Sequence, residues 1–188
     1  MPDLTVRDAV VAAADDLFYR RGVQAVGMDE LRTAAGVSLK RLYREFESKD
    51  AIVLAVLDHR TRSWQDCVSR TVDAATTPRD KLLAIYDYLV DWTGDDAFRG
   101  CGFINTFGEL GSVNLAVADA VRAHKEGFAD YVARLAEDVG LDADVAPQLV
   151  LLAEGAQTMA AITQEPAWAT AARAAASTLI DAGLAPRS

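Results

Sequence analysis

The chain has 188 residues, of which 51% are hydrophobic, and a formal net charge of −9 at pH 7. No segment reaches the roughly 18 uninterrupted apolar residues of a membrane span, and the first residues do not resemble an export signal. The two cysteines, Cys67 and Cys101, do not form the closely spaced pairs of a disulfide scaffold or a zinc site. We therefore expect neither a metal nor a cofactor, and a reducing, cytoplasmic environment.

The charge is distributed unevenly along the chain. Residues 1–62 hold ten basic and ten acidic side chains, whereas residues 63–188 hold nine and eighteen. Between Arg32 and Lys49, five basic side chains stand against two acidic ones. A predominantly acidic protein repels a phosphate backbone unless it presents a dedicated basic patch. The asymmetry indicates two sections with different roles.

A helical repeat of apolar residues begins near the N-terminus. Val6, Val10, Ala13 and Leu17 predict the buried stripe of a first helix, which Gly22 is placed to end. Clusters of β-branched residues with a period of two do not occur in the sequence. We therefore expect an all-α fold of about nine helices.

Two short helices joined by a turn follow the first helix. They are predicted from about Met28 to Ala34 and from Ser38 to about Glu45. Gly36 suits the left-handed residue after a helix end, and Ser38 suits an N-cap. This pattern is typical of a helix-turn-helix, although an ordinary helical corner with solvated charges has the same local pattern. The apolar residues expected to pack against the first helix are Met28, Leu31, Ala34, Ala35, Val37, Leu42 and Phe46.

The remaining sequence predicts longer helices. Ser48 is placed to cap the fourth, and Thr77, Pro78 and Asp80 form a capping pattern at the start of the fifth. Further helix boundaries are marked by Gly111, Gly140 and Pro166. The helix at 145–163 has two apolar faces and therefore needs two packing partners.

The outward face of the third predicted helix carries side chains that suit DNA. They are Ser38, Leu39, Lys40, Arg41, Tyr43 and Arg44. Lysine and arginine can bond guanine edges, tyrosine and serine can bond phosphate oxygens, and an aliphatic side chain can contact a thymine methyl group. Lys49 begins the fourth helix, where free backbone N–H groups also favour a phosphate.

Residues 22–57 resemble the DNA-binding section of TetR-type transcriptional repressors. The shared pattern is Ala-Gly-Val-Ser at 35–38, Leu-Tyr at 42–43, an aromatic residue at 46 and Ser-Lys-Asp at 48–50. The resemblance implies a helix-turn-helix DNA-binding domain at 1–47 and a helical ligand-binding and dimerisation domain at 48–188. It also implies which side chains contact DNA. Those facing bases are Ser38, Leu39, Lys40 and Arg44, and those holding phosphates are Tyr43 and Lys49.

Three positions depart from the family pattern. Val26-Gly27 stand where the family often has a threonine cap, and Leu31-Arg32 stand where it often has Ile-Ala. Glu45 stands where a histidine or tyrosine is common, and a carboxylate cannot donate to a phosphate. Arg32 is the candidate replacement for that phosphate contact.

Apolar and aromatic side chains of the C-terminal section are candidates for an inducer pocket, although the same residues can simply fill a core. They are Trp64, Tyr86, Trp92, Phe103, Phe107, His124, Phe128 and Met159. His124 lies on an apolar stripe, where a buried histidine with satisfied hydrogen bonds is the commoner case. Cys101 is likewise either a redox-sensing thiol beside Arg99 or an ordinary buried cysteine.

The alanine-rich last two helices predict a homodimer, because small residues let helices pack closely and two copies would form a four-helix seam. The residues proposed for this seam are Leu149, Leu152, Ala156, Met159, Trp168, Ala172, Ala175 and Leu179. Either face of the helix at 145–163 can supply it.

The sequence thus predicts a repressor that binds a palindromic DNA operator as a homodimer and is released by an apolar or aromatic inducer. The alternative is an all-helical small-molecule-binding protein without operator binding. No membrane partner is expected, and no pairing of nucleophile and base or phosphate-binding loop suggests an enzyme. Inducer, operator, regulated genes and the choice between repressor and activator are left open by the sequence.

Overall fold

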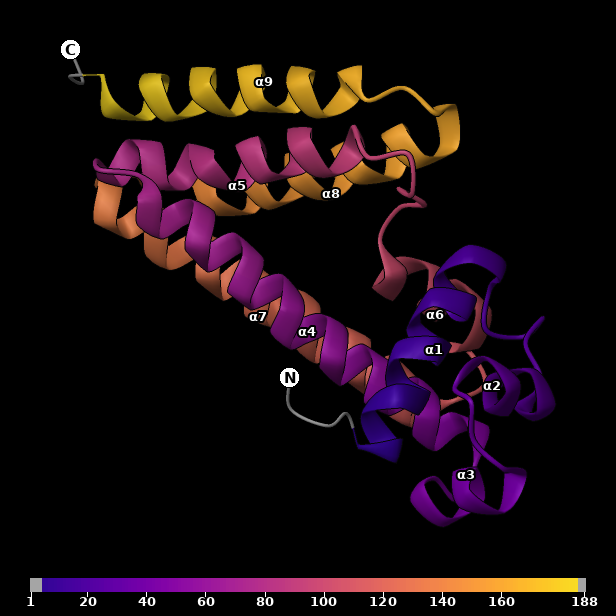
Figure 1. The fold of residues 1–188 in the computed structure, drawn as a ribbon. Helices are drawn as coiled ribbons and strands as arrows, with labels where there is room; N and C mark the ends of the chain where they lie inside the picture. Colours follow the sequence, from indigo (N-terminus) through magenta and orange to yellow (C-terminus); the bar gives the residue numbers. More distant parts are fainter. Residues whose placement is uncertain (1–4, 186–188) are drawn as a thin grey trace. The chain divides into compact units, whose positions relative to one another are not determined.

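The computed structural model describes residues 5–185, which form nine α-helices and no strand (Figure 1). The predicted all-α fold is therefore confirmed. The chain divides into two compact units, one of residues up to Ser63 with Gly102–Ala123, the other of Trp64–Cys101 with the residues from His124 onward. The predicted boundary at residue 47 separates a DNA-binding domain from a ligand-binding domain by their roles. The two units are defined by packing instead, so that boundary stays a prediction.

The first unit contains the helix-turn-helix. Its helices are α1 (Val6–Arg21), α2 (Met28–Ala34), α3 (Leu39–Glu45), the start of α4 (Lys49–Ala74), α6 (Gly102–Leu110) and the start of α7 (Leu115–Val139). Thr5 caps α1 in a reciprocal capping box with Asp8. The buried residues of α1 are Val10, Val11, Ala14 and Phe18. Val10 lies on the predicted stripe, whereas Val6, Ala13 and Leu17 are half-buried, so the buried stripe is rotated toward Val11, Ala14 and Phe18. On this side α1 packs against α2 and α3.

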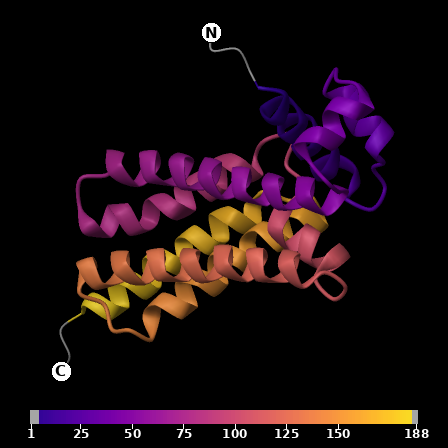
Figure 2. The same cartoon turned by 90° about the horizontal axis from the view of Figure 1, so that it is seen from below.

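The second unit is a bundle of the remaining parts of α4 and α7 with α5 (Pro78–Thr93), α8 (Val145–Thr163) and α9 (Ala167–Leu184). Figure 2 shows α8 and α9, in orange and yellow, running side by side, and α5 also packs against both. The predicted cap of α5 is present, because the Thr77 hydroxyl accepts a hydrogen bond from the Asp80 backbone N–H at 3.1 Å. Inside the bundle, the Tyr86 hydroxyl donates to the Leu149 carbonyl at 2.6 Å, and burial raises the Tyr86 pKa.

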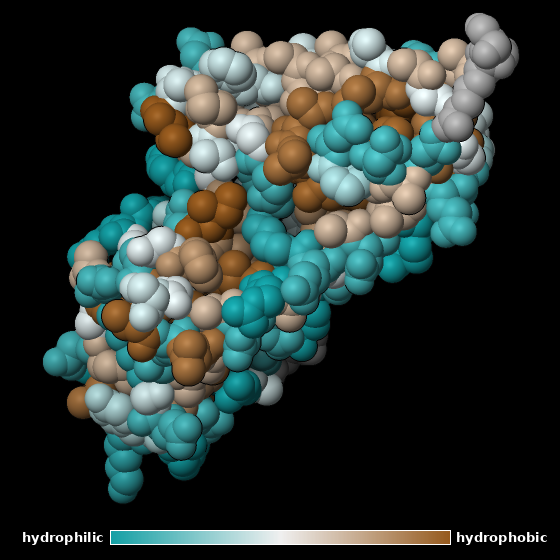
Figure 3. All heavy atoms as spheres, turned by 180° about the vertical axis from the view of Figure 1, so that it is seen from behind, coloured by the Kyte–Doolittle hydropathy of each residue, from teal (hydrophilic) through white to brown (hydrophobic). Residues whose placement is uncertain are grey.

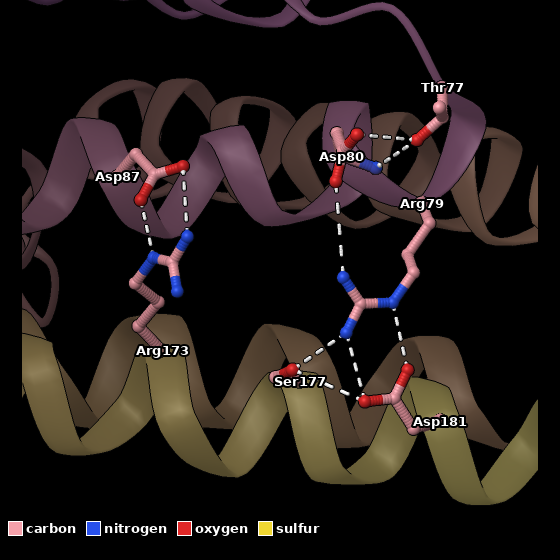
Figure 4. A network of polar contacts seen from close by, with 7 residues as sticks. All are labelled: Thr77, Arg79, Asp80, Asp87, Arg173, Ser177 and Asp181. Carbon is pink, nitrogen blue, oxygen red and sulfur yellow. Dashed lines mark hydrogen bonds and ion pairs between the residues drawn. The ribbon is translucent and has the colours of Figure 1, made fainter.

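Ion pairs join α5 to α9 along one side of the bundle (Figure 4). The Arg79 guanidinium donates to both carboxylate oxygens of Asp181, at 2.8 and 2.9 Å, and to the Ser177 hydroxyl at 2.8 Å. Further along the same two helices, Arg173 of α9 forms an ion pair with Asp87 of α5. The hydrogen bond from Arg79 lowers the pKa of the Asp181 carboxyl. Most of these side chains are only half-buried, so water screens the ion pairs and each contributes little to the stability of the bundle.

Helix α8 has the two apolar faces that the sequence predicted. One face, with Leu149, Ala153 and Ala156, is buried in the bundle, whereas Leu151 and Ile162 on the other are 72% and 73% exposed. Among the described residues, α8 is the one helix long and apolar enough to cross a membrane by length and composition alone. A bundle helix with two apolar faces meets the same criterion.

Candidate nucleic-acid interface

The turn between α2 and α3 has the geometry expected of a helix-turn-helix. The Ala35 N–H donates to the Leu31 carbonyl at 2.9 Å, and the Val37 N–H donates to the Arg32 carbonyl at 3.0 Å. Gly36 between them has a φ of 66°, in the left-handed region that glycine adopts cheaply. Ser38 then caps α3, with its hydroxyl oxygen accepting from the Arg41 N–H at 3.3 Å.

One face of α3 is fixed in the core of the first unit. Leu42 and Phe46 are 0% and 2% exposed, and Leu31 of α2 is equally buried. Because α3 is only two turns long, these two anchors determine which of its side chains point outward. The apolar side of the predicted motif is thus confirmed for these three residues.

The opposite face of α3 is exposed, and half of its side chains are basic. All six side chains expected there are exposed: Ser38, Leu39, Lys40, Arg41, Tyr43 and Arg44. Arg44 lies 3.6 Å from the Glu45 carboxylate, but its side chain is 67% exposed, and a surface pair of this kind is weak enough to be exchanged for a DNA group. Within residues 5–185 the structure gives Lys40, Arg41 and Lys49 no ion-pair partner.

The predicted phosphate ligands differ in their exposure and in whether they already have a partner within the protein. Lys49 is the first residue of α4, whose N-terminus is capped by the Ser48 hydroxyl accepting from the Ala51 N–H at 3.1 Å. Tyr43 is 49% exposed. Arg32, by contrast, donates to the Asp29 carboxylate at 2.8 Å, so it must leave this partner or share it to contact DNA.

Arg7 is a basic residue of this unit that the sequence reasoning missed. Its guanidinium lies 4.4 Å from the centre of the Phe46 ring and donates to the Glu45 carbonyl at 3.3 Å. It therefore satisfies a carbonyl at the C-terminal end of α3. Arg7 and Glu45 are 38 residues apart in sequence, so no local pattern could have indicated this contact.

The second unit brings together some of the candidate pocket residues. The Trp64 ring makes edge contacts with His124, Phe128 and Tyr131, at centroid distances of 5.5, 5.3 and 6.4 Å. Burial, and secondarily the Lys125 charge, lowers the His124 pKa to about 4, so this imidazole is neutral at pH 7. A small, open crevice adjoins this cluster. It is lined by Trp64, Gln65, Val68, Ser69, Gly127, Tyr131 and Arg134.

The other pocket candidates lie elsewhere. Trp92 stacks on Tyr88 and contacts Phe98. Tyr86 is buried in the bundle, and Met159 of α8 is half-buried. Phe103 and Phe107 belong to the first unit, where Phe103 is buried and Phe107 is 49% exposed.

Cys101 is buried, and the Lys125 ammonium lies 3.4 Å from its sulfur while pairing with the Glu154 carboxylate at 2.6 Å. Its redox role stays a hypothesis. Across residues 5–185, no cluster of three or more His, Cys, Asp or Glu side chains is arranged to hold a metal ion.

The proposed seam residues divide by burial within the single chain. Leu149, Ala156 and Ala172 lie in the core of their own bundle, so their side chains are not available to a second copy. Leu152, Met159, Ala175 and Leu179 are half-buried, and Trp168 is 42% exposed. Figure 3 shows a mostly apolar surface over α8 and α9 in the upper part of that view. Of the two faces of α8, the one with Leu151 and Ile162 is exposed, while the choice of face for a seam stays a prediction.

Comparisons with known proteins agree with this geometry. The family of bacterial regulatory proteins described as the tetR family matches residues 10–56, which span the helix-turn-helix. The HTH-type transcriptional activator FasR of Mycolicibacterium smegmatis is 32% identical over 139 residues, covering 73% of this chain and 62% of the relative. The HTH-type transcriptional repressor ComR of Escherichia coli is 27% identical, covering 65% of this chain and 59% of the relative. The match thus spans less than two thirds of the length of these curated relatives.

The crystal structure of a TetR-family transcriptional regulator from Streptomyces coelicolor superposes with a TM-score of 0.88 at 27% identity, covering 95% of both chains. A regulator from Cytophaga hutchinsonii superposes with a TM-score of 0.85 at 18% identity, which extends the likeness of fold alone. The helix-turn-helix of residues 10–56 thus matches the tetR family, and the regulator relatives and the shared fold support a TetR-family transcriptional regulator.

Proposed function

We propose that this protein regulates transcription by binding a palindromic operator as a homodimer and is released from it by a small molecule. The observation that carries the proposal is the outward face of α3, where basic and hydroxyl side chains are exposed while Leu42 and Phe46 hold the helix from behind. Each α3 enters a major groove, and the half-sites lie about 34–36 Å apart or at a multiple of that distance.

The contacts with DNA divide into two kinds. Ser38, Leu39, Lys40 and Arg44 face base edges and determine the sequence preference. Tyr43 and Lys49 contact phosphates and set affinity and orientation, with Arg32 as a further phosphate ligand once it leaves Asp29. The Ser38 hydroxyl oxygen accepts from the Arg41 N–H, which leaves its own proton free for donation to DNA.

The homodimer forms through the exposed faces of α8 and α9. The apolar residues Leu151, Ile162 and Trp168 are exposed on these two neighbouring helices, and Gly155 lies between the first two without a side chain. A contiguous exposed apolar surface of this kind is typical of a protein–protein interface. Two copies of this face form a four-helix seam around a two-fold axis, as a palindromic operator requires.

The ligand is a small apolar or aromatic molecule that binds in the second unit. The cluster of Trp64, His124 and Phe128 supplies aromatic surface, and the neutral imidazole supplies one polar contact. To release the operator, the ligand must bind the conformation that does not bind DNA more tightly than the one that does.

Repression is the direction of regulation that we propose. Among the relatives, one is named an activator and another a repressor, so both directions occur among proteins similar to this chain. The protein acts in the cytoplasm, where bacterial DNA is accessible. No catalytic role is assigned to it.

One observation favours the alternative of a small-molecule-binding protein without an operator. Gly27 is the N-cap of α2 and supplies no side-chain hydrogen bond, so it replaces the threonine that in the family often both caps this helix and contacts a phosphate. Selection of duplexes from a random library decides between the two. An enriched palindrome bound with a steep salt dependence supports the regulator, whereas no enrichment at low salt supports the alternative.

A further inference from the structure

Glu109, near the C-terminal end of α6, holds the connection between α1 and α2. One carboxylate oxygen accepts from the Val23 N–H at 2.9 Å, and the other accepts from the Gln24 N–H at 2.8 Å. The Gln24 side-chain amide donates in turn to the Glu109 carbonyl at 2.9 Å. Three hydrogen bonds thus join two segments that are about 85 residues apart in sequence and belong to the same unit.

These backbone groups have no helical partner of their own. Helix α1 closes with the Gly22 N–H donating to the Phe18 carbonyl, and the next two N–H groups both donate to Glu109. A hydrogen bond from an N–H to a carboxylate is stronger than one to a neutral acceptor. The carboxylate therefore does for this connection what a capping side chain does for a helix end.

The connection is also packed from the inside. Val23 and Val26 are 3% and 1% exposed, and Gly22 has a φ of 83°. A Cβ added at Gly22 would lie 2.9 Å from Oε1 of Glu109, so the glycine makes room for the carboxylate. The buried valines and the carboxylate together hold residues 22–26 in one position.

A second contact ties the following segment to the N-terminus of α4. The Asn114 amide donates to the Asp50 carboxylate at 2.9 Å, while its oxygen accepts from the Val117 N–H at 3.2 Å. Asp50 adjoins Lys49, one of the proposed phosphate ligands. The segment 102–123 therefore holds the helix-turn-helix at both of its ends.

We propose that Glu109 is a positioning residue for DNA binding. It holds the α1–α2 connection and thereby fixes the angle at which α2 and α3 are presented to DNA. The proposal rests on the proposed operator binding. It is distinct from DNA contact, because Glu109 is itself acidic and can only repel a phosphate.

This charge makes the proposal sharply testable. If Glu109 acted on DNA only through its charge, its removal would strengthen DNA binding. If it positions α2 and α3, its removal weakens binding although a negative charge has been lost. The two accounts differ in the sign of the change.

The experiment compares the wild type with Glu109→Ala, Glu109→Gln and the control Asp119→Ala. Asp119 is an exposed carboxylate of the same unit that pairs with Arg122 on its own helix. Binding to the duplex selected by the wild type is measured over a range of salt concentrations, at a temperature where thermal unfolding shows every variant folded. Amide hydrogen exchange of Val23 and Gln24 is followed in the free protein.

We expect Glu109→Ala to lower affinity about tenfold with an unchanged salt slope, and to speed exchange at both amides. Glu109→Gln retains one acceptor oxygen, so its affinity and exchange rates should lie between those of the wild type and Glu109→Ala. It also replaces the alanine variant in the comparison if that variant does not fold. Asp119→Ala leaves affinity unchanged or raises it. Unchanged or tighter DNA binding by both Glu109 variants would overturn the proposal, even with faster exchange. If the wild type selects no duplex, the proposed function fails. The exchange data then still test whether the Glu109 carboxylate protects the Val23 and Gln24 amides.

Discussion

The guanidinium of Arg7 lies over the ring of Phe46, 4.4 Å from its centre, and so joins the first turn of α1 to the residue that anchors the end of α3. The same guanidinium donates to the Glu45 carbonyl. Two weak interactions therefore converge at the C-terminal end of the proposed recognition helix.

Replacing Arg7 by alanine should remove both interactions. We expect the free energy of unfolding to fall by about 1 kcal/mol, since an exposed cation–π contact and one hydrogen bond are each of this order or less. Urea denaturation measures the change. Arg20→Ala is the matched control, because its exposed ion pair with Asp16 within α1 contributes little. Equal stabilities of the two variants would contradict the role given to Arg7.

Arg44 and Lys49 should differ in what they contribute to DNA binding. Arg44→Ala should relax base preference at one position, because a base-reading arginine contributes about 1–3 kcal/mol there. Lys49→Ala should weaken binding to all duplexes alike and reduce the salt slope by about one. Affinities for the selected palindrome and for single-base variants distinguish these outcomes. The assignment is wrong if both substitutions weaken binding to one sequence only.

Tyr43→Phe isolates a single hydroxyl on the exposed face of α3. Loss of one hydrogen bond to a phosphate should cost about 1–2 kcal/mol of binding free energy. The side chain is 49% exposed, so the substitution should leave thermal stability almost unchanged. Affinity equal to that of the wild type would mean that this tyrosine does not contact DNA.

His124 should make the second unit less stable in mild acid. Burial and the Lys125 charge lower its pKa from 6.5 to about 4, so the unfolded chain binds this proton more readily than the folded one. Stability is therefore complete above about pH 6.5 and falls as the pH drops toward 4. Since the group is partly exposed, the loss should be no more than about 2 kcal/mol. Urea unfolding of His124→Gln should lose less stability than the wild type over this range, whereas the exposed control His59→Gln should behave like the wild type.

Leu151→Glu should disrupt the proposed dimer. Two such carboxylates would be buried in a two-fold seam without partners, which is far more costly than the seam can offset. Sedimentation should show a folded monomer, while the control Val113→Glu, at a side chain 78% exposed in the first unit, stays dimeric. A dimeric Leu151→Glu variant would show that the seam lies elsewhere.

The sequence by itself determined the helices and their ends, because caps and turns are local. The predicted boundaries of α2 and α3, the left-handed Gly36 and the capping pair Thr77–Asp80 all reappear in the structure. The outward face of α3 was also predictable, because Leu42 and Phe46 lie on one side of two helical turns.

Only the tertiary structure decided which apolar face is buried and which distant residues meet. A two-faced helix such as α8 has the same periodicity on both sides, so its pattern could not tell the core residue Leu149 from the exposed Leu151. The contacts of Arg7 with the end of α3, and of Glu109 with the α1–α2 connection, join segments 38 and more than 80 residues apart. Such pairings depend on how the whole unit packs, because a charged side chain at the surface carries no local signal of the backbone group that it will bind.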